Sequence, residues 1–86
     1  MFTGLITHLG KVSEIKETKK NDTYVGIEIN WNDDLNIGSS VCCNGVCLTV
    51  IDKKINYFGV ELSNETINRT NFQYLKLNST INLEKS

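Results

Sequence analysis

The segment "SSVCCNGVCLTV", residues 39–50, constrains the fold more than any other part of the chain. It places Asn44-Gly45 between two runs of β-forming residues. This dipeptide favours a type I′ turn, because both central residues of that turn need a positive φ angle. We therefore expect a β-hairpin with a two-residue loop. Its register pairs Cys43 with Val46, Cys42 with Cys47, Val41 with Leu48 and Ser40 with Thr49.

Alternation along the two strands of this hairpin divides its side chains between two faces. One face is apolar and is expected in the core; it consists of Val41, Cys43, Val46, Leu48 and Val50. The other face is small and weakly polar; it consists of Ser40, Cys42, Cys47 and Thr49. Such a face suits the wall of a pocket in which a ligand lies close to the sheet. It equally suits close packing under a neighbouring element.

The rest of the chain shows the same two-residue periodicity. Apolar side chains alternate in "TYVGIEI" and in "YFGVEL", so each segment is predicted to be a strand with one buried face. Further strands are expected at 2–6, 11–16 and 80–83, separated by the turn-forming stretches "KKND", "NWNDD", "DKKIN" and "KLNS". Several short strands at this spacing predict a small antiparallel barrel, since closing the sheet removes its exposed edges.

The segment "SNETINRTNFQYL", residues 63–75, breaks this alternation. It begins with Ser63 and Asn64, which are good N-cap residues, and Glu65 follows in the first turn, where the helix dipole favours a carboxylate. We expect a helix of one or two turns that covers one end of the barrel. In the same helix Arg69 is expected to be a solvated charge.

Length and charge limit the classes of function. A chain of 86 residues supports one small domain, residues 1–86. The net charge of −1 gives no electrostatic attraction to nucleic acids or anionic membranes. The segment "MFTGLITHLG" lacks the features of a signal peptide, and no apolar run is long enough to span a bilayer. We expect a cytoplasmic protein.

The three cysteines could serve a metal, a disulfide or a nucleophile. Zinc needs four Cys or His ligands at recognisable spacing, and the chain has one histidine, His8, and no second pair of cysteines, so no metal is expected. Cys42 and Cys47 would be close enough to cross-link, although the cytoplasm is expected to keep them reduced. Nucleophilic catalysis would need a nearby base, and His8 is treated as a surface or strand-edge residue.

Four stretches in the order of one family, "MFTG", "NGVCLTV", "ELSNETINRTN" and "INLEKS", make the chain resemble the N-terminal barrel of riboflavin synthase, from Met1 to Ser86. The resemblance implies an all-β fold, a small closed six-stranded antiparallel Greek-key barrel with one short helix. It also implies a transferase that converts two molecules of 6,7-dimethyl-8-ribityllumazine to riboflavin and 5-amino-6-ribitylamino-uracil. No cofactor or metal is implied; the lumazine and riboflavin bind as substrate and product.

The resemblance assigns the small polar face of the hairpin to the ligand. Ser40, Cys47 and Thr49 would border it, with Ser40 and Cys47 the candidates for a catalytic role. Backbone groups of Glu61, Leu62 and Ser63 would meet the polar edge of the pteridine, and Thr66 would add its hydroxyl. The other residues that the resemblance places at the ligand or the pocket mouth are Thr3, Gly4, Leu5 and Leu48.

Members of the family carry two barrels and form their active site between the first barrel of one subunit and the second of another. The resemblance covers the first barrel only, which implies a homodimer for the barrel alone and a homotrimer for the full-length synthase. Two functions are open: the N-terminal domain of the enzyme, or a non-catalytic lumazine- or flavin-binding module. "NGVCLTV" and "ETINRTN" favour the enzyme. A small barrel with a protein partner is the third alternative.

Overall fold

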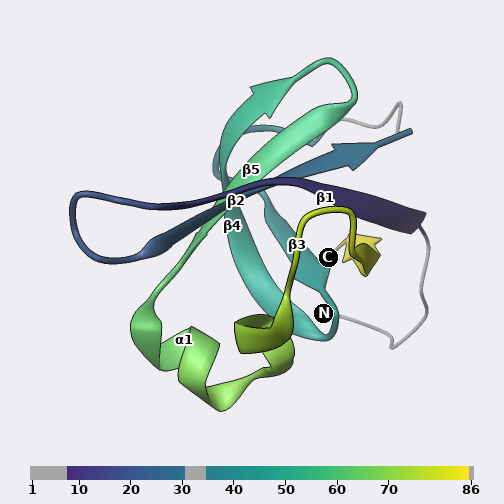
Figure 1. The fold of residues 1–86 in the computed structure, drawn as a ribbon. Coiled ribbons are helices and arrows are strands. Elements are labelled where there is room, and N and C mark those ends of the chain that lie inside the picture. The colour runs from purple at the N-terminus through teal and green to yellow at the C-terminus, as the bar shows by residue number, and fades with distance from the viewer. Residues whose placement is uncertain (1–7, 31–34, 86) are drawn as a thin grey trace.

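The computed structural model describes residues 8–30 and 35–85, which form a closed antiparallel barrel (Figure 1). The strands are β1 (His8–Glu17), β2 (Thr23–Ile29), β3 (Ser40–Cys43), β4 (Val46–Lys54), β5 (Tyr57–Leu62) and β6 (Thr80–Lys85). One short α-helix, α1 (Asn64–Arg69), and one 3₁₀ helix, η1 (Asn71–Tyr74), lie between β5 and β6. The predicted all-β class with a short helix is confirmed.

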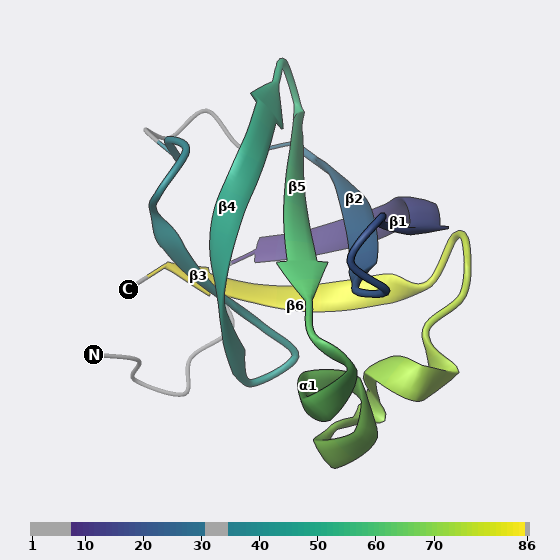
Figure 2. The same cartoon turned by 90° about the vertical axis from the view of Figure 1, so that its left-hand side faces the viewer.

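The order of the strands around the barrel is β1-β2-β5-β4-β3-β6. β3, β4 and β5 follow one another as hairpins, and β6 returns to lie beside β3, which is the Greek-key arrangement (Figure 2). β6 also pairs with β1 and so closes the barrel. The six-stranded Greek-key prediction is therefore confirmed.

The hairpin of β3 and β4 has the predicted register in all four pairs. Asn44 and Gly45 have φ angles of 48° and 86°, as a type I′ turn requires. Three more asparagines with positive φ, Asn21, Asn56 and Asn78, lie in the predicted turns "KKND", "DKKIN" and "KLNS". Asparagine tolerates this conformation because its side chain bonds to the nearby backbone.

The core lies inside the barrel and contains the apolar face of every described strand. Its side chains with less than 2% exposure are Phe58, Ile27, Leu62, Ile81, Leu83, Val12, Val41, Val50, Val60 and Cys43. The predicted strand at 11–16 lies within β1, and that at 80–83 lies within β6. The predicted strand at 2–6 and most of the turn "NWNDD" lie outside the described residues.

The segment after β5 turns away from the barrel and lies across one end of it (Figure 2). Ser63 is the N-cap of α1, and its hydroxyl accepts a hydrogen bond of 3.2 Å from the Thr66 N–H. Phe72 of η1 is buried and packs into the core. This apolar contact explains why helices with so few residues are held in place, since isolated helices of this length are not stable.

Glu65 and Arg69 both point into solvent from α1. Their side chains form an (i, i+4) ion pair of 3.0 Å in which each is more than 65% exposed. Such a pair contributes little to the free energy of unfolding, because solvent screens it. No helix within the described ranges has the length and apolar character needed to cross a membrane.

Candidate functional site

The pairing of β4 with β5 stops partway along both strands. It runs from Lys54 and Tyr57, next to the turn, to Val50 and Val60. β4 continues for four residues to Val46 and β5 for two residues to Leu62 without further pairing between them. The two strands separate toward α1 (Figure 2). We call this unpaired stretch, residues 46–49 of β4 and 61–62 of β5, the seam.

The backbone of β4 presents polar groups to the seam. The Val50 N–H donates to the Ser39 C=O at 2.9 Å, and the Gly38 N–H donates to the Val50 C=O at 2.8 Å. Val50 therefore bonds toward β3. Because bonding direction alternates along a strand, the N–H and C=O groups of Thr49 and Cys47 point the other way, toward β5.

The backbone of β5 also presents polar groups to the seam, from the opposite side. The Ile29 N–H of β2 donates to the Asn56 C=O at 3.0 Å, which fixes the direction of bonding between β2 and β5. By the same alternation Leu62 bonds toward its partner Thr23 on β2, and Glu61 presents its N–H and C=O to β4. Of the predicted backbone contacts on β5, Glu61 is thus placed at the seam, whereas Leu62 is directed to β2.

The outward-facing side chains at and beside the seam belong to residues that the sequence analysis predicted for the ligand site. Ser40 is the cross-strand partner of Thr49. Thr49 and Glu61 lie one residue beyond the last pair of β4 and β5, on the same outer face, and both are exposed. Cys47 is exposed two residues further along β4. We call these four residues, which lie on the outer face of three strands, the polar strip.

Ser63 and Thr66 close the strip at the end near α1. Their hydroxyls are joined by a hydrogen bond of 3.1 Å, so the N-cap that starts α1 also orients Thr66. Leu48 and Leu62 lie under the strip with 8% and 1% exposure, and their side chains belong to the core. The predicted residues Thr3, Gly4 and Leu5 lie outside the described residues.

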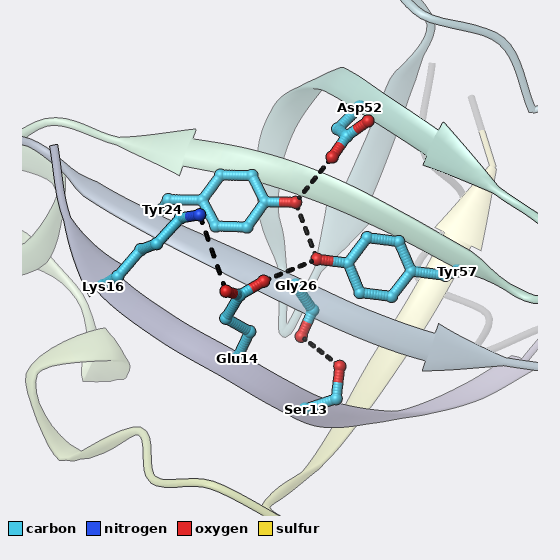
Figure 3. A network of polar contacts seen from close by, with 7 residues as sticks. All are labelled: Ser13, Glu14, Lys16, Tyr24, Gly26, Asp52 and Tyr57. Atoms are coloured by element: carbon cyan, nitrogen blue, oxygen red, sulfur yellow. Dashed lines mark hydrogen bonds and ion pairs between the residues drawn. The ribbon is translucent and has the colours of Figure 1, made fainter.

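A cluster of tyrosines and carboxylates adjoins the strip, because Tyr24 is the cross-strand partner of Glu61 (Figure 3). The Tyr24 hydroxyl donates to Asp52 at 3.0 Å, and the Tyr57 hydroxyl donates to Glu14 at 3.1 Å. The two hydroxyls lie 2.7 Å apart. Burial raises the pKa of both phenols, so both stay neutral. The hydrogen bond with Tyr57 raises the pKa of Tyr24 further, and the bond to Asp52 adds to this effect.

Sequence reasoning missed this cluster, which draws its residues from four strands. A signal was present in the spacing: Tyr24 precedes Gly26 and Tyr57 precedes Gly59 by two residues. Gly26 and Gly59 are cross-strand partners, and a Cβ on either would overlap the tyrosine of the opposite strand. An aromatic ring that covers a glycine across a strand pair is a known stabilising device.

A large hollow of the described surface lies elsewhere. Its volume is about 740 Å³, it is wide open to solvent, and it lies where the turn between β4 and β5 meets β1 and β2. Leu9 and Ile55 on its rim are 61% and 92% exposed. It contains none of the predicted site residues. We prefer the seam as the candidate site, because directed backbone groups and hydroxyls converge there, whereas a volume alone specifies no ligand.

The cysteines and His8 are divided between the outer face and the core-facing side of the sheet. Cys47 is exposed on the outer face, whereas Cys43 is fully buried and its burial raises the pKa of its thiol to about 12. His8 is half-buried and pairs with Leu83, which in turn pairs with Cys43, so it shares their core-facing side. Among residues 8–30 and 35–85, no three His, Cys, Asp or Glu side chains are grouped to hold a metal ion.

Comparison with known proteins gives one consistent result. Residues 3–86 match the family model of the lumazine binding domain. The chain is 41% identical over 88 residues to a riboflavin synthase of Photobacterium phosphoreum and 37% identical over 89 residues to that of Actinobacillus pleuropneumoniae. A riboflavin synthase of Schizosaccharomyces pombe is 36% identical over 87 residues. Each alignment covers all of this chain and 40–42% of the relative. The chain belongs to the lumazine binding domain family.

Proposed function

We propose that the chain binds 6,7-dimethyl-8-ribityllumazine or riboflavin at the seam, as the first of the two barrels of a riboflavin synthase. The proposal rests on one observation: the pairing of β4 with β5 stops at Val50 and Val60, before either strand ends. It leaves backbone groups of Cys47, Thr49 and Glu61 directed into one gap, beside side-chain hydroxyls. The match to the lumazine binding domain and the similarity to riboflavin synthases support the choice of ligand.

The proposed ligand has the shape that such a seam accepts. The polar edge of a pteridine carries donors and acceptors in one plane, so it can bond to the strand edges as an added strand would. The hydroxyls of Ser40, Thr49 and Thr66 then face the ribityl chain, which is itself a row of hydroxyls. Leu48 and Leu62 supply the apolar floor beneath the ring.

The reaction proposed for the whole enzyme joins two lumazines. The C7 methyl of one lumazine loses a proton, and the carbanion attacks the other molecule, which has become an acceptor after addition of a nucleophile; transfer of a four-carbon unit follows. Holding two rings face to face supplies a large part of the rate, up to roughly 7–11 kcal/mol in favourable cases. Ser40 and Cys47 are our candidates for a direct role, because both lie on the outer face at the seam.

We base the proposed assembly on the share of its relatives that the chain covers. The chain spans about 40% of the riboflavin synthases that it matches. We propose that a second barrel completes the site, that the barrel alone forms a homodimer through the same surface, and that the full-length synthase is a homotrimer. We also place the protein in the cytoplasm, where its three free thiols would stay reduced.

Three measurements test the proposal. Titration of riboflavin with the protein should quench or shift the flavin fluorescence and saturate at one ligand per barrel. Sedimentation should show a dimer, and an assay of riboflavin formation should show little or no turnover by this chain alone. Absence of binding would overturn the proposed function, a strict monomer would overturn the assembly, and full synthase activity would overturn the need for a second barrel.

A further inference from the structure

We propose that Cys42 and Cys47 form a redox-active dithiol, which a peroxide converts to a cross-strand disulfide on the outer face of the hairpin between β3 and β4. The two residues are direct partners in the register of the hairpin. Both thiols are free in the structure. The proposal does not depend on the identity of the ligand at the seam.

The type of strand pair favours this bond. In an antiparallel pair, residues alternate between hydrogen-bonded positions, with Cα atoms about 5.5 Å apart, and non-hydrogen-bonded positions, about 4.5 Å apart. The Val50 N–H donates to the Ser39 C=O, so Val50 bonds toward the β3 side of β4 and the bonding direction alternates from there along β4. Three steps toward the turn, Cys42 and Cys47 are therefore a non-hydrogen-bonded pair. Their expected separation of about 4.5 Å lies inside the range of disulfides, about 4.4–6.8 Å.

The barrel holds the two cysteines in this arrangement. β3 pairs with β6 on its other side, where Glu84 is the partner of Cys42, and β4 continues into its pairing with β5. The type I′ turn at Asn44 and Gly45 fixes the hairpin from the end. The thiols are thus kept adjacent, and a bond between them requires no separation of strands.

The two thiols differ in a way that gives each a role. Cys47 is exposed, so a dissolved oxidant reaches it directly. Cys42 is 8% exposed; burial raises the pKa of its thiol, the hydrogen bond with the Gly45 backbone lowers it, and the negative charges of Glu84 and Cys47 raise it. Cys47 is therefore the attacking thiol, and Cys42 is the resolving thiol.

The reaction balances with hydrogen peroxide as the oxidant. The Cys47 thiol releases its proton, and the thiolate attacks one peroxide oxygen. The O–O bond breaks and the departing hydroxide takes up that proton, so the products are a sulfenic acid on Cys47 and one water. The Cys42 sulfur then attacks the Cys47 sulfur, the S–O bond breaks, and the hydroxyl leaves as a second water with the proton of Cys42. The two sulfurs lose two electrons in total, and the peroxide is reduced to two waters.

Cys43 provides an internal control. It is adjacent to Cys42 in the sequence, yet its side chain faces the core with 0% exposure, and burial raises the pKa of its thiol to about 12. A thiol that is neutral and shielded from water reacts slowly with peroxide. Oxidation controlled by this geometry therefore spares Cys43, whereas non-specific oxidation does not.

Differential alkylation of the whole chain tests the proposal. The protein is treated with hydrogen peroxide and unfolded in the presence of one alkylating label; it is then reduced and treated with a second label, and mass spectrometry locates both. The expected result is a chain that has lost two hydrogens and has no covalent link to a second chain, with the first label on Cys43 and the second on Cys42 and Cys47. Any other pairing, or a disulfide between two chains, would overturn the proposal.

Two matched variants complete the test. Cys43→Ala keeps both proposed partners, so the intramolecular disulfide should form as in the unaltered chain. Cys42→Ala removes the resolving thiol, so peroxide should leave Cys47 as a sulfenic acid that a dimedone-type probe traps. A disulfide between Cys43 and Cys47 in the Cys42→Ala protein, or loss of the disulfide in Cys43→Ala protein of unchanged circular dichroism, would contradict the proposal.

Discussion

The hydroxyl oxygens of Tyr24 and Tyr57 lie 2.7 Å apart on the outside of the barrel, and each ring covers a glycine of the other strand. Tyr24 of β2 lies over Gly59 of β5. Tyr57 of β5 lies over Gly26 of β2 (Figure 3). Lys16 and Lys54 stand over the two rings, at 4.9 and 5.2 Å from their centroids. This reciprocal arrangement holds β2 and β5 together beside the seam.

Replacing Gly26 by alanine should destabilise the barrel. The new Cβ would overlap the ring and hydroxyl of Tyr57, so that ring must move and lose its bonds to Tyr24 and Glu14. Overpacking of this kind costs about 1–3 kcal/mol in the free energy of unfolding. Urea unfolding measures the loss, with Gly26→Ala in a Tyr57→Ala background as the control. An equal cost in both backgrounds would show that the ring is not the cause.

Alkaline pH should destabilise the protein through Cys43. Its pKa is raised by burial from 9.0 to about 12 in the folded state, so above pH 9.0 the unfolded chain releases a proton that the folded chain retains. Stability is therefore complete below pH 9.0 and falls as the pH rises toward 12, by at most about 1.4 kcal/mol per pH unit from this group. Urea unfolding of Cys43→Val and the unaltered chain across this interval isolates the effect. Parallel pH profiles for the two proteins would refute it.

Removing the N-cap hydroxyl should loosen α1. Ser63→Ala leaves the Thr66 N–H without its acceptor and Thr66 without the hydroxyl that orients it. Loss of such a cap costs about 1 kcal/mol. Hydrogen exchange at the amides of α1 should become several-fold faster, while the amides of β1 and β2 keep their rates. Ser63→Asp, which retains a capping oxygen, should restore the slow exchange; if it does not, the cap is not what holds the helix.

Thr49→Val should weaken ligand binding without altering the fold. The change deletes an exposed hydroxyl at the seam at near-constant volume, and a hydrogen bond to a neutral ligand is worth about 0.5–1.5 kcal/mol. The dissociation constant for riboflavin should therefore rise by a few-fold to roughly tenfold. Thr80→Val is the matched control, because Thr80 is an exposed strand threonine that lines the large hollow instead. A larger effect at Thr80 than at Thr49 would move the site to that hollow.

How much could be predicted from the sequence depended on how local the cause was. The hairpin at Asn44-Gly45 was predictable to the register, because a two-residue turn fixes every pair that follows it. The N-cap at Ser63 was also predictable, because a cap depends only on the residues at the start of the helix. The seam was not, since the point where β4 leaves β5 depends on the irregularity between Val50 and Asp52 and on the closure of the barrel.

The carboxylate partners of the two tyrosines were unpredictable for a related reason. Glu14 reaches Tyr57 only because β1 has an irregularity between Val12 and Glu14 that changes its register against β2. Asp52 of β4 reaches Tyr24 of β2 across β5, which lies between these two strands in the barrel. Such contacts arise from pairing between distant segments, and a single sequence contains no local signal for them.

The most direct test of the account is a map of backbone amide shifts on titration with riboflavin. Two-dimensional NMR of the isotope-labelled protein reports each N–H separately. We predict that the largest shifts fall on Cys47, Thr49 and Glu61, whose amides border the seam, with smaller changes at Thr66 in α1. Shifts centred on Lys54, Ile55 and Asn56 at the large hollow, or a spectrum that does not change at saturating riboflavin, would contradict the assignment of the ligand to the seam.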